Sequence, residues 1–134
     1  MANGIRWCVV SVPTLEWAKQ VFPDSKNPKD KLANEIIKTM RLDTENPVLE
    51  WEKHIEKLEY RAEFLNNNDF TALHFKNTAG TDFTVGLSNG HKWLSARETA
   101  KDGLYFVANM PTEEVFTAPH RLHADGKYRF GEFF

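Results

Sequence analysis

The sequence predicts an α+β fold in which two or three amphipathic helices pack on a mostly antiparallel sheet. The first half is rich in Glu and Lys at helical spacing, whereas the second half alternates apolar and polar residues between glycine turns. No linker-like tract separates the halves. We therefore expect residues 1–134 to form a single domain, or a fragment of a larger α/β enzyme, with a helical half at about 14–66 and a β-meander half at about 70–134.

The chain begins with a nearly continuous β-branched run, Ile5–Val12, which predicts a strand covered on both faces. Cys8 lies within this run, so we expect a buried thiol rather than a catalytic one. It is the only cysteine, which excludes an intramolecular disulfide. Thr14 can then cap a short helix that ends at Pro23. Its predicted apolar face is Leu15, Trp17, Ala18, Val21 and Phe22.

Two further helices each follow an Asn-Pro pair, Asn27-Pro28 and Asn46-Pro47, which supplies a cap and a proline for the first turn. The apolar positions of the first are Leu32, Ala33, Ile36, Ile37 and Met40. Those of the second are Val48, Trp51, Ile55, Leu58, Ala62 and Leu65. The alternating spacing of the second set predicts an amphipathic helix of about five turns. Its apolar stripe either faces the core, which we favour for so short a repeat, or forms a coiled-coil seam.

From Phe70 onward the apolar period becomes two, which predicts strands. Asn77–Gly80 fits a hairpin turn between two of them. Further turns are expected at Asn89-Gly90, Asp102-Gly103 and Asp125-Gly126, with strands at 92–96, 104–108, 114–118 and 127–134. The second half is therefore predicted to be an antiparallel meander.

The charge balance and the hydropathy exclude several classes of protein. Lys and Arg number 17 and Asp and Glu 19, for a net charge of -2, so nucleic acid is not an expected partner. No run approaches the roughly 18 apolar residues that a membrane span needs, so no membrane partner is expected. The first residues also lack the pattern of a signal peptide, and we expect a cytoplasmic protein.

Carboxylates and imidazoles gather in one part of the sequence, where Glu113-Glu114 precedes His120 and His123. This group could bind a divalent metal, or it could form a solvated polar turn. If Glu113 and Glu114 lie in a strand, their side chains point to opposite faces, so at most one of them faces a given cavity.

The other polar candidates are isolated. Asp82 is either a polar residue at the rim of the sheet or a ligand contact, and His74 is expected on a sheet face or in the core. His54 and His91 are expected to be solvated. The sequence contains no GxSxG, HExxH, Walker or GxGxxG motif. The residue pattern alone thus leads to an α+β domain with a candidate carboxylate site.

Several segments together, in order from about residue 5 to 127, are more specific than any one of them. They are Trp7–Val10 with Pro13, Trp17–Lys19, Val21–Pro23, Trp51–His54, Leu73–Phe75, Gly80–Leu87 and Asn109–Arg121. Taken together, the sequence resembles about the middle third of the thermophilic metallo-aminopeptidases of the aminopeptidase T and AmpS type.

This resemblance implies an exopeptidase that removes the N-terminal residue of a peptide with two divalent ions, either zinc, cobalt, manganese or magnesium. It places one metal ligand at Glu114. Glu113 and His120 match the motif as neighbours without an assigned role, and Asp82 is a further candidate neighbour. The remaining ligands come from a carboxy-terminal part of the family that the resemblance does not reach, so we expect this chain alone to be inactive.

The last residues, Tyr128–Phe134, depart from the family pattern and are strongly aromatic. They suggest the alternative function of a free-standing peptide- or protein-binding module, which would also use Trp93, Tyr105 and Phe106. Exposed aromatic residues favour association. We therefore expect a homo-oligomer, such as a dimer.

Overall fold

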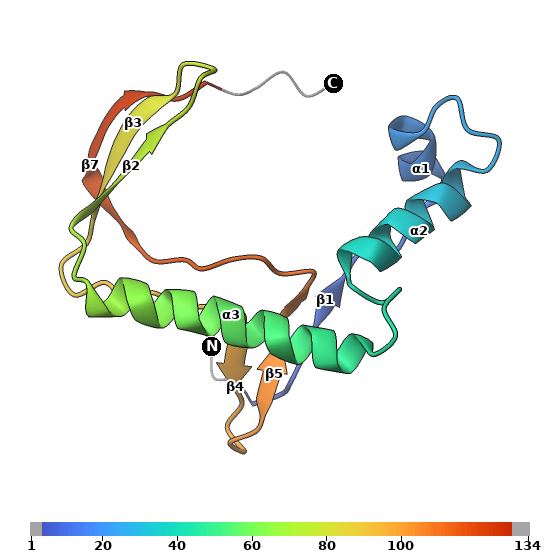
Figure 1. The fold of residues 1–134 in the computed structure, drawn as a ribbon, viewed down its shortest axis with the longest axis horizontal. Helices are drawn as coiled ribbons and strands as arrows, with labels where there is room; N and C mark the ends of the chain where they lie inside the picture. Colours follow the sequence, from blue (N-terminus) through green and yellow to red (C-terminus); the bar gives the residue numbers. More distant parts are fainter. Residues whose placement is uncertain (1–3, 130–134) are drawn as a thin grey trace. The chain divides into compact units, whose positions relative to one another are not determined.

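The structure is a computed structural model that describes residues 4–129. Its elements, in order, are β1 (Val9–Val10), α1 (Leu15–Val21), α2 (Pro28–Thr39), α3 (Pro47–Asn67), β2 (Ala72–Lys76), β3 (Asp82–Leu87), β4 (Arg97–Thr99), β5 (Tyr105–Val107), β6 (Asn109–Met110) and β7 (Pro119–Lys127) (Figure 1). The α+β class with mostly antiparallel strands is confirmed. Within residues 4–129, the strands form three small sheets, in the orders β1-β6, β2-β3-β7 and β4-β5, and only β1 and β6 pair in parallel.

The chain divides into two compact units. The first unit comprises Met1–Glu59 and Ala96–Glu114, and the second comprises Tyr60–Ser95 and Val115–Phe134. Each unit is therefore built from two separate stretches of sequence, and α3 contributes its first part to one unit and its last part to the other.

Two of the expected helix caps are present. The Thr14 hydroxyl accepts a hydrogen bond from the Trp17 amide at 3.2 Å, and the Asn46 side chain accepts one from the Leu49 amide at 3.1 Å. Asn27 occupies the cap position of α2, but its side chain forms no capping hydrogen bond, and Pro28 starts that helix.

The apolar stripe of α3 faces the protein interior, as predicted. Trp51, Ile55 and Leu58 are buried in the first unit, and Leu58 is fully inaccessible to solvent. Ala62 is buried in the second unit. Val48 is 69% exposed and its predicted burial is wrong, because it lies in the first turn of the helix, beyond the covered part of the stripe.

The beginning of the chain differs most from the prediction. The strand is limited to Val9–Val10, and both side chains are exposed, so the expected strand covered on both faces is wrong for the described residues. Its hydrogen bonding is to β6 and the residue before it, with the Val9 amide donating to the Ala108 carbonyl at 2.8 Å. Cys8, next to this strand, is exposed rather than buried, because the strand is not covered on both faces as predicted. On α1, only Ala18 of the predicted apolar face is fully buried.

The second unit is organised around the β2–β3 hairpin. The predicted turn at Asn77–Gly80 is confirmed: the Gly80 amide donates to the Asn77 carbonyl, and the Asn77 side chain accepts from the Thr81 amide at 3.0 Å. The second unit contains a small hydrophobic core. It consists of Ala62, Leu87 and Trp93, with Leu65, Leu73 and Val115 packed against them.

The path after Glu114 also differs from the prediction. Residues 114–118 do not form a strand, and only Phe116 forms a bridge, with Leu94. The predicted turn at Asp125-Gly126 is instead part of β7. Gly126 has a φ of 118°, and a Cβ atom there would meet the Asp82 carbonyl oxygen, so the close approach of β3 requires glycine.

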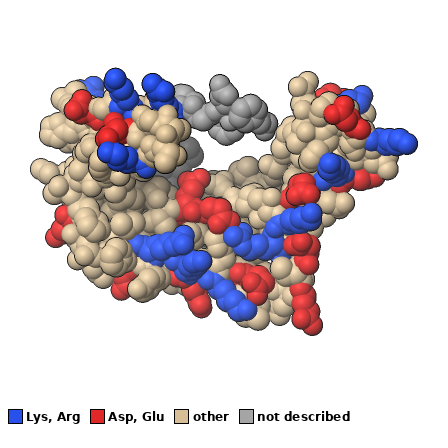
Figure 2. Space-filling model, turned by 45° about the horizontal axis from the view of Figure 1, so that its top comes forward, with Lys and Arg blue, Asp and Glu red and all other residues tan. Residues whose placement is uncertain are grey.

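The last predicted strand, 127–134, is wrong in its described part, because β7 ends at Lys127. Residues 130–134 lie outside the described residues. Among the described helices, none combines the length and the hydropathy needed to cross a membrane. On the face drawn in Figure 2, Lys and Arg side chains are interspersed with Asp and Glu.

Candidate functional site

The segment that leaves β6 ends in two glutamates with different surroundings. It passes through Thr112, which is buried, to Glu113 and Glu114, which are both exposed. The Glu113 carboxylate contacts the side chains of Arg41 and His54. Among the described residues, the Glu114 carboxylate forms no hydrogen bond or ion pair. The two adjacent carboxylates therefore differ in their availability to a ligand.

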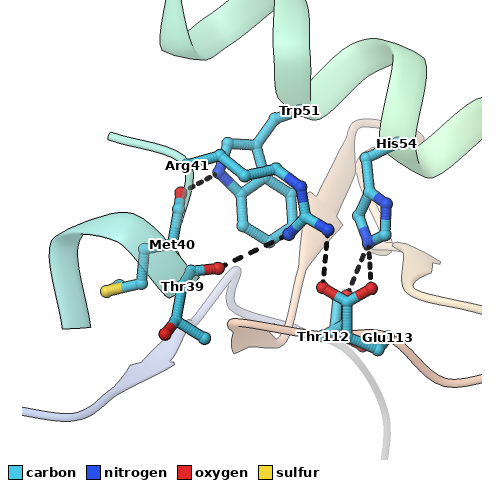
Figure 3. A network of polar contacts seen from close by, with 7 residues as sticks. All are labelled: Thr39, Met40, Arg41, Trp51, His54, Thr112 and Glu113. Carbon is cyan, nitrogen blue, oxygen red and sulfur yellow. Dashed lines mark hydrogen bonds and ion pairs between the residues drawn. The ribbon is translucent and has the colours of Figure 1, made fainter. Parts of the chain in front are cut away.

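Glu113 is anchored by residues from the helical part of the first unit. Oε1 of Glu113 lies 2.7 Å from Nη2 of Arg41, and Oε2 lies 3.4 Å from Nε2 of His54 (Figure 3). Arg41 follows the end of α2, and His54 lies on α3. The negative charge of Glu113 is thus already offset by the Arg41 guanidinium.

His54 is nearly buried, with a side chain 10% exposed, so the prediction that it is solvated is wrong. Its Nε2 also lies 2.7 Å from the Thr112 carbonyl oxygen. A carbonyl oxygen can only accept a hydrogen bond, so Nε2 carries a hydrogen and donates it. The sequence signal for burial was the position of His54 one helical turn after Trp51, on the flank of the apolar stripe.

Trp51 contacts both the Arg41 side chain and the main chain of the preceding residue, Met40. Its indole Nε1 donates to the Met40 carbonyl at 2.7 Å, and this hydrogen bond ties the end of α2 to α3 (Figure 3). The Arg41 guanidinium carbon lies 5.6 Å from the centre of the Trp51 ring. Arg41 itself has a φ of 55°, a left-handed conformation that redirects the chain after the helix.

An open hollow of about 380 Å³ lies beside this network and shares Trp51 with it. Its lining is almost entirely apolar and includes Ile55, Val107 and Met110. Glu52 is the one charged residue on its edge. Such a surface can accommodate an apolar group, but it carries no chemistry of its own.

Asp82 belongs to a charged cluster on the sheet of the second unit, together with His74 and Lys76. Its Oδ1 accepts a hydrogen bond from His74 Nε2 at 2.8 Å, and its Oδ2 lies 3.0 Å from Lys76 Nζ. The hydrogen bond from His74, together with Lys76, holds the pKa of the Asp82 carboxyl below its ordinary value. His74 lies on an exposed face of the sheet, which is one of the two positions predicted for it.

The remaining histidines lie in the second unit. His120 and His123 are on β7, so the expected turn is wrong there, and their rings stack with centroids 3.9 Å apart. The His120 Nδ1 accepts a hydrogen bond from the Leu122 amide at 3.3 Å. His91 is half-buried rather than solvated, because it contacts the Ser88 carbonyl and packs edge-on against Trp93.

The fit of these residues to a metal ion is partial. Within residues 4–129, no three His, Cys, Asp or Glu side chains are grouped so as to hold one. Glu114 fits the role of a single ligand, because its carboxylate is exposed and has no hydrogen-bond or ion-pair partner in the described part of the chain to displace. Glu113 fits less well, because an ion would have to compete with Arg41 for its oxygens.

The comparisons with known proteins place the chain among the metallopeptidases. Residues 1–132 match the family described as Thermophilic metalloprotease (M29). The chain belongs to this family.

Individual relatives are similar over nearly the whole chain. The chain is 42% identical over 128 residues to Aminopeptidase PepS of Streptococcus thermophilus, which covers 93% of this chain and 31% of that protein. It is 42% identical over 125 residues to Aminopeptidase T of Thermus aquaticus, covering 92% and 30%. The solved structure titled wild-type AmpT from Thermus thermophilus superposes with a TM-score of 0.79 at 38% identity, over 90% of this chain and 29% of that one. The chain thus spans about 30% of the length of these relatives.

Proposed function

We propose that this chain is a segment of a metal-dependent aminopeptidase that hydrolyses the N-terminal residue from peptides, and that Glu114 is one of its metal ligands. The observation that carries the proposal is the contrast between two adjacent carboxylates in a chain of this family. Arg41 and His54 engage Glu113, whereas Glu114 is exposed and unpaired among the described residues. The names of the relatives, which are aminopeptidases, support the reaction class.

Two divalent ions, of zinc, cobalt, manganese or magnesium, would supply Lewis-acid polarisation of the scissile carbonyl and an activated water. Toward that chemistry this chain contributes the Glu114 carboxylate, a hard and negatively charged oxygen donor. Glu113 serves as an anchor, because its two oxygens are directed at Arg41 and His54.

The described residues supply too few ligands for a pair of ions, since no group of three candidate ligands occurs among them. We therefore expect the chain alone to be inactive and to require further segments of the kind found in its longer relatives. One carboxylate leaves most of the coordination sphere of each ion to water, which gives weak and unspecific binding.

An aminopeptidase assay tests this proposal directly. The purified chain is incubated with a dipeptide and with added cobalt, manganese, zinc or magnesium, beside an extended protein that contains the same residues and the remaining family segments. We expect metal-dependent release of an amino acid by the extended protein and none by the chain. Turnover by the chain would contradict the expected inactivity, and the absence of turnover from the extended protein with every metal would contradict the aminopeptidase function.

A further inference from the structure

We infer that His54 and Arg41 are positioning residues, which hold the segment Thr112–Glu113 against the helices and so fix the direction in which Glu114 presents its carboxylate. This inference rests on the proposed role of Glu114 as a metal ligand. It assigns a role to two side chains that lie far from Glu113 in sequence and that contribute no ligand themselves.

The segment Thr112–Glu113 is held at two different points. The His54 Nε2 hydrogen bond of 2.7 Å holds the main chain at the Thr112 carbonyl. The Arg41 contact of 2.7 Å holds the side chain of Glu113, and His54 Nε2 lies 3.4 Å from the same carboxylate. Because one contact is made to the main chain and another to a side chain, both the position and the rotation of this segment are restricted (Figure 3).

His54 and Arg41 are in turn held in place by packing around Trp51. His54 is nearly buried on α3, and an edge-on contact with Trp51 at 5.6 Å between ring centroids orients its imidazole. Arg41 lies over the Trp51 ring, and the Trp51 hydrogen bond to the Met40 carbonyl fixes the residue just before it. A side chain that is packed and hydrogen-bonded in this way keeps its geometry when its partner moves.

The support at Thr112 and Glu113 extends to Glu114 through the peptide chain. A ligand side chain must be held within about 0.5 Å of its productive position to contribute fully to a metal site. The Glu114 side chain forms no hydrogen bond or ion pair among the described residues, so the backbone of the residues before it sets its direction. Groups that orient metal ligands typically change metal affinity by about 10–100-fold when they are removed. The network of His54 and Arg41 supplies such orientation here through the peptide chain.

Backbone order in this chain, measured by ¹⁵N relaxation, tests the inference without any metal. With both contacts present, we expect the order parameters of the Glu113 and Glu114 amides to be near 0.85, the value of rigid backbone. His54→Leu, which keeps an apolar side chain and removes the donor, should lower them toward about 0.6. Arg41→Met should lower the order parameter of Glu113 in the same way. The order parameters of β3, in the second unit, should remain unchanged.

Conservative variants separate positioning from a general loss of structure. His54→Gln retains an amide donor at a similar distance from the helix, and Arg41→Lys retains the positive charge, so both should restore part of the lost order. His74→Leu is the matched control, because it removes a histidine that pairs with a carboxylate in the second unit. It should leave the Glu113 and Glu114 order parameters at the wild-type value.

Three results would overturn the inference. The first is unchanged order parameters at Glu113 and Glu114 in both His54→Leu and Arg41→Met. The second is a loss of order at these amides in His74→Leu equal to that in His54→Leu. The third is that His54→Gln and Arg41→Lys restore none of the order lost in His54→Leu and Arg41→Met. If His54→Leu fails to fold, Arg41→Met decides the question, because it changes a partly exposed side chain. None of these measurements uses turnover. The positioning inference can therefore fail while the aminopeptidase proposal holds, and the aminopeptidase proposal can fail while the positioning inference holds.

Discussion

Arg41 and Glu113 form an ion pair with 2.7 Å between Nη2 and Oε1, whereas the next residue, Glu114, has no such partner among the described residues. The side chains of the pair are 29% and 58% exposed, so the pair adds only about 0–1 kcal/mol to stability. Its main consequence is geometric. Because the two oxygens of Glu113 are directed at Arg41 and His54, a further cation would have to compete with these side chains for them.

The burial of Leu58 leads to a first prediction. Leu58 is 0% exposed on the apolar stripe of α3, and Leu58→Ala should lower the free energy of unfolding by about 2–5 kcal/mol through lost transfer energy and a cavity. Urea unfolding measures this change. Lys57→Ala, at the exposed position next to it, is the control and should change stability by less than about 0.5 kcal/mol. A similarly small change for Leu58→Ala would mean that the helix packs by another face.

The hydrogen bond between Trp51 and Met40 gives a second prediction. Trp51→Phe keeps most of the ring but leaves the Met40 carbonyl without its donor, in a buried position. An unsatisfied buried acceptor costs about 1–3 kcal/mol, so the unfolding free energy should fall by that amount. Trp17→Phe replaces an exposed indole and should cost less than about 0.5 kcal/mol. Equal effects of the two substitutions would show that the hydrogen bond contributes nothing specific.

The cluster around Asp82 predicts a pH dependence. The hydrogen bond from His74, followed by Lys76, lowers the pKa of Asp82 in the folded state. A depressed folded pKa stabilises the protein above the unfolded pKa of about 4, and this contribution is lost as the pH falls through the folded value. His74→Leu should therefore raise the pKa of Asp82 toward its ordinary value. An NMR titration of the Asp82 carboxyl carbon measures this pKa, and an unchanged value would show that His74 is not the main cause.

Much of the fold follows from local sequence patterns. The 3-4 spacing along α3 predicted the burial of Trp51, Ile55 and Leu58, and the turn at Asn77–Gly80 predicted the β2–β3 hairpin. These features depend on residues close in sequence, whose period and turn chemistry are visible directly. The strand at Ile5–Val12 could not be judged in this way, because its burial depends on what covers it rather than on its own period.

The candidate site shows the same limit. The resemblance to the family indicated Glu114, but the roles of Arg41 and His54 arise from contacts with a segment far along the chain. A histidine between charged residues on a helix resembles a solvated one until its distant partner is known. Strand alternation was the wrong reason for separating Glu113 from Glu114, because residues 112–115 are not in a strand. The two carboxylates differ instead because Glu113 contacts Arg41 and His54, whereas Glu114 has no ion-pair partner among the described residues.

The exposed apolar residues near β1 lead to a prediction about association. Ile5 is 79% exposed and Val12 is 71% exposed, so the chain presents an apolar surface that favours self-association. We expect light scattering to show species larger than a monomer at micromolar concentration. Ile5→Lys combined with Val12→Lys should shift the distribution toward the monomer, and deletion of Tyr128–Phe134 tests the aromatic end separately. A monomer throughout this range, unchanged by all of these variants, would contradict the prediction.

The last prediction compares the two glutamates in an extended protein that carries the complete set of metal ligands. Glu114→Gln keeps the shape of the side chain and removes the charge that offsets the ion, so it should weaken metal binding and lower turnover by orders of magnitude. Glu113→Gln should cost much less, by about 10–100-fold at most, because Glu113 acts through its contacts with Arg41 and His54. Calorimetric metal titration of both variants, with turnover followed alongside, measures the difference. If Glu113→Gln were the more damaging substitution, the ligand would be Glu113, and an ion would have to displace Arg41 from that carboxylate.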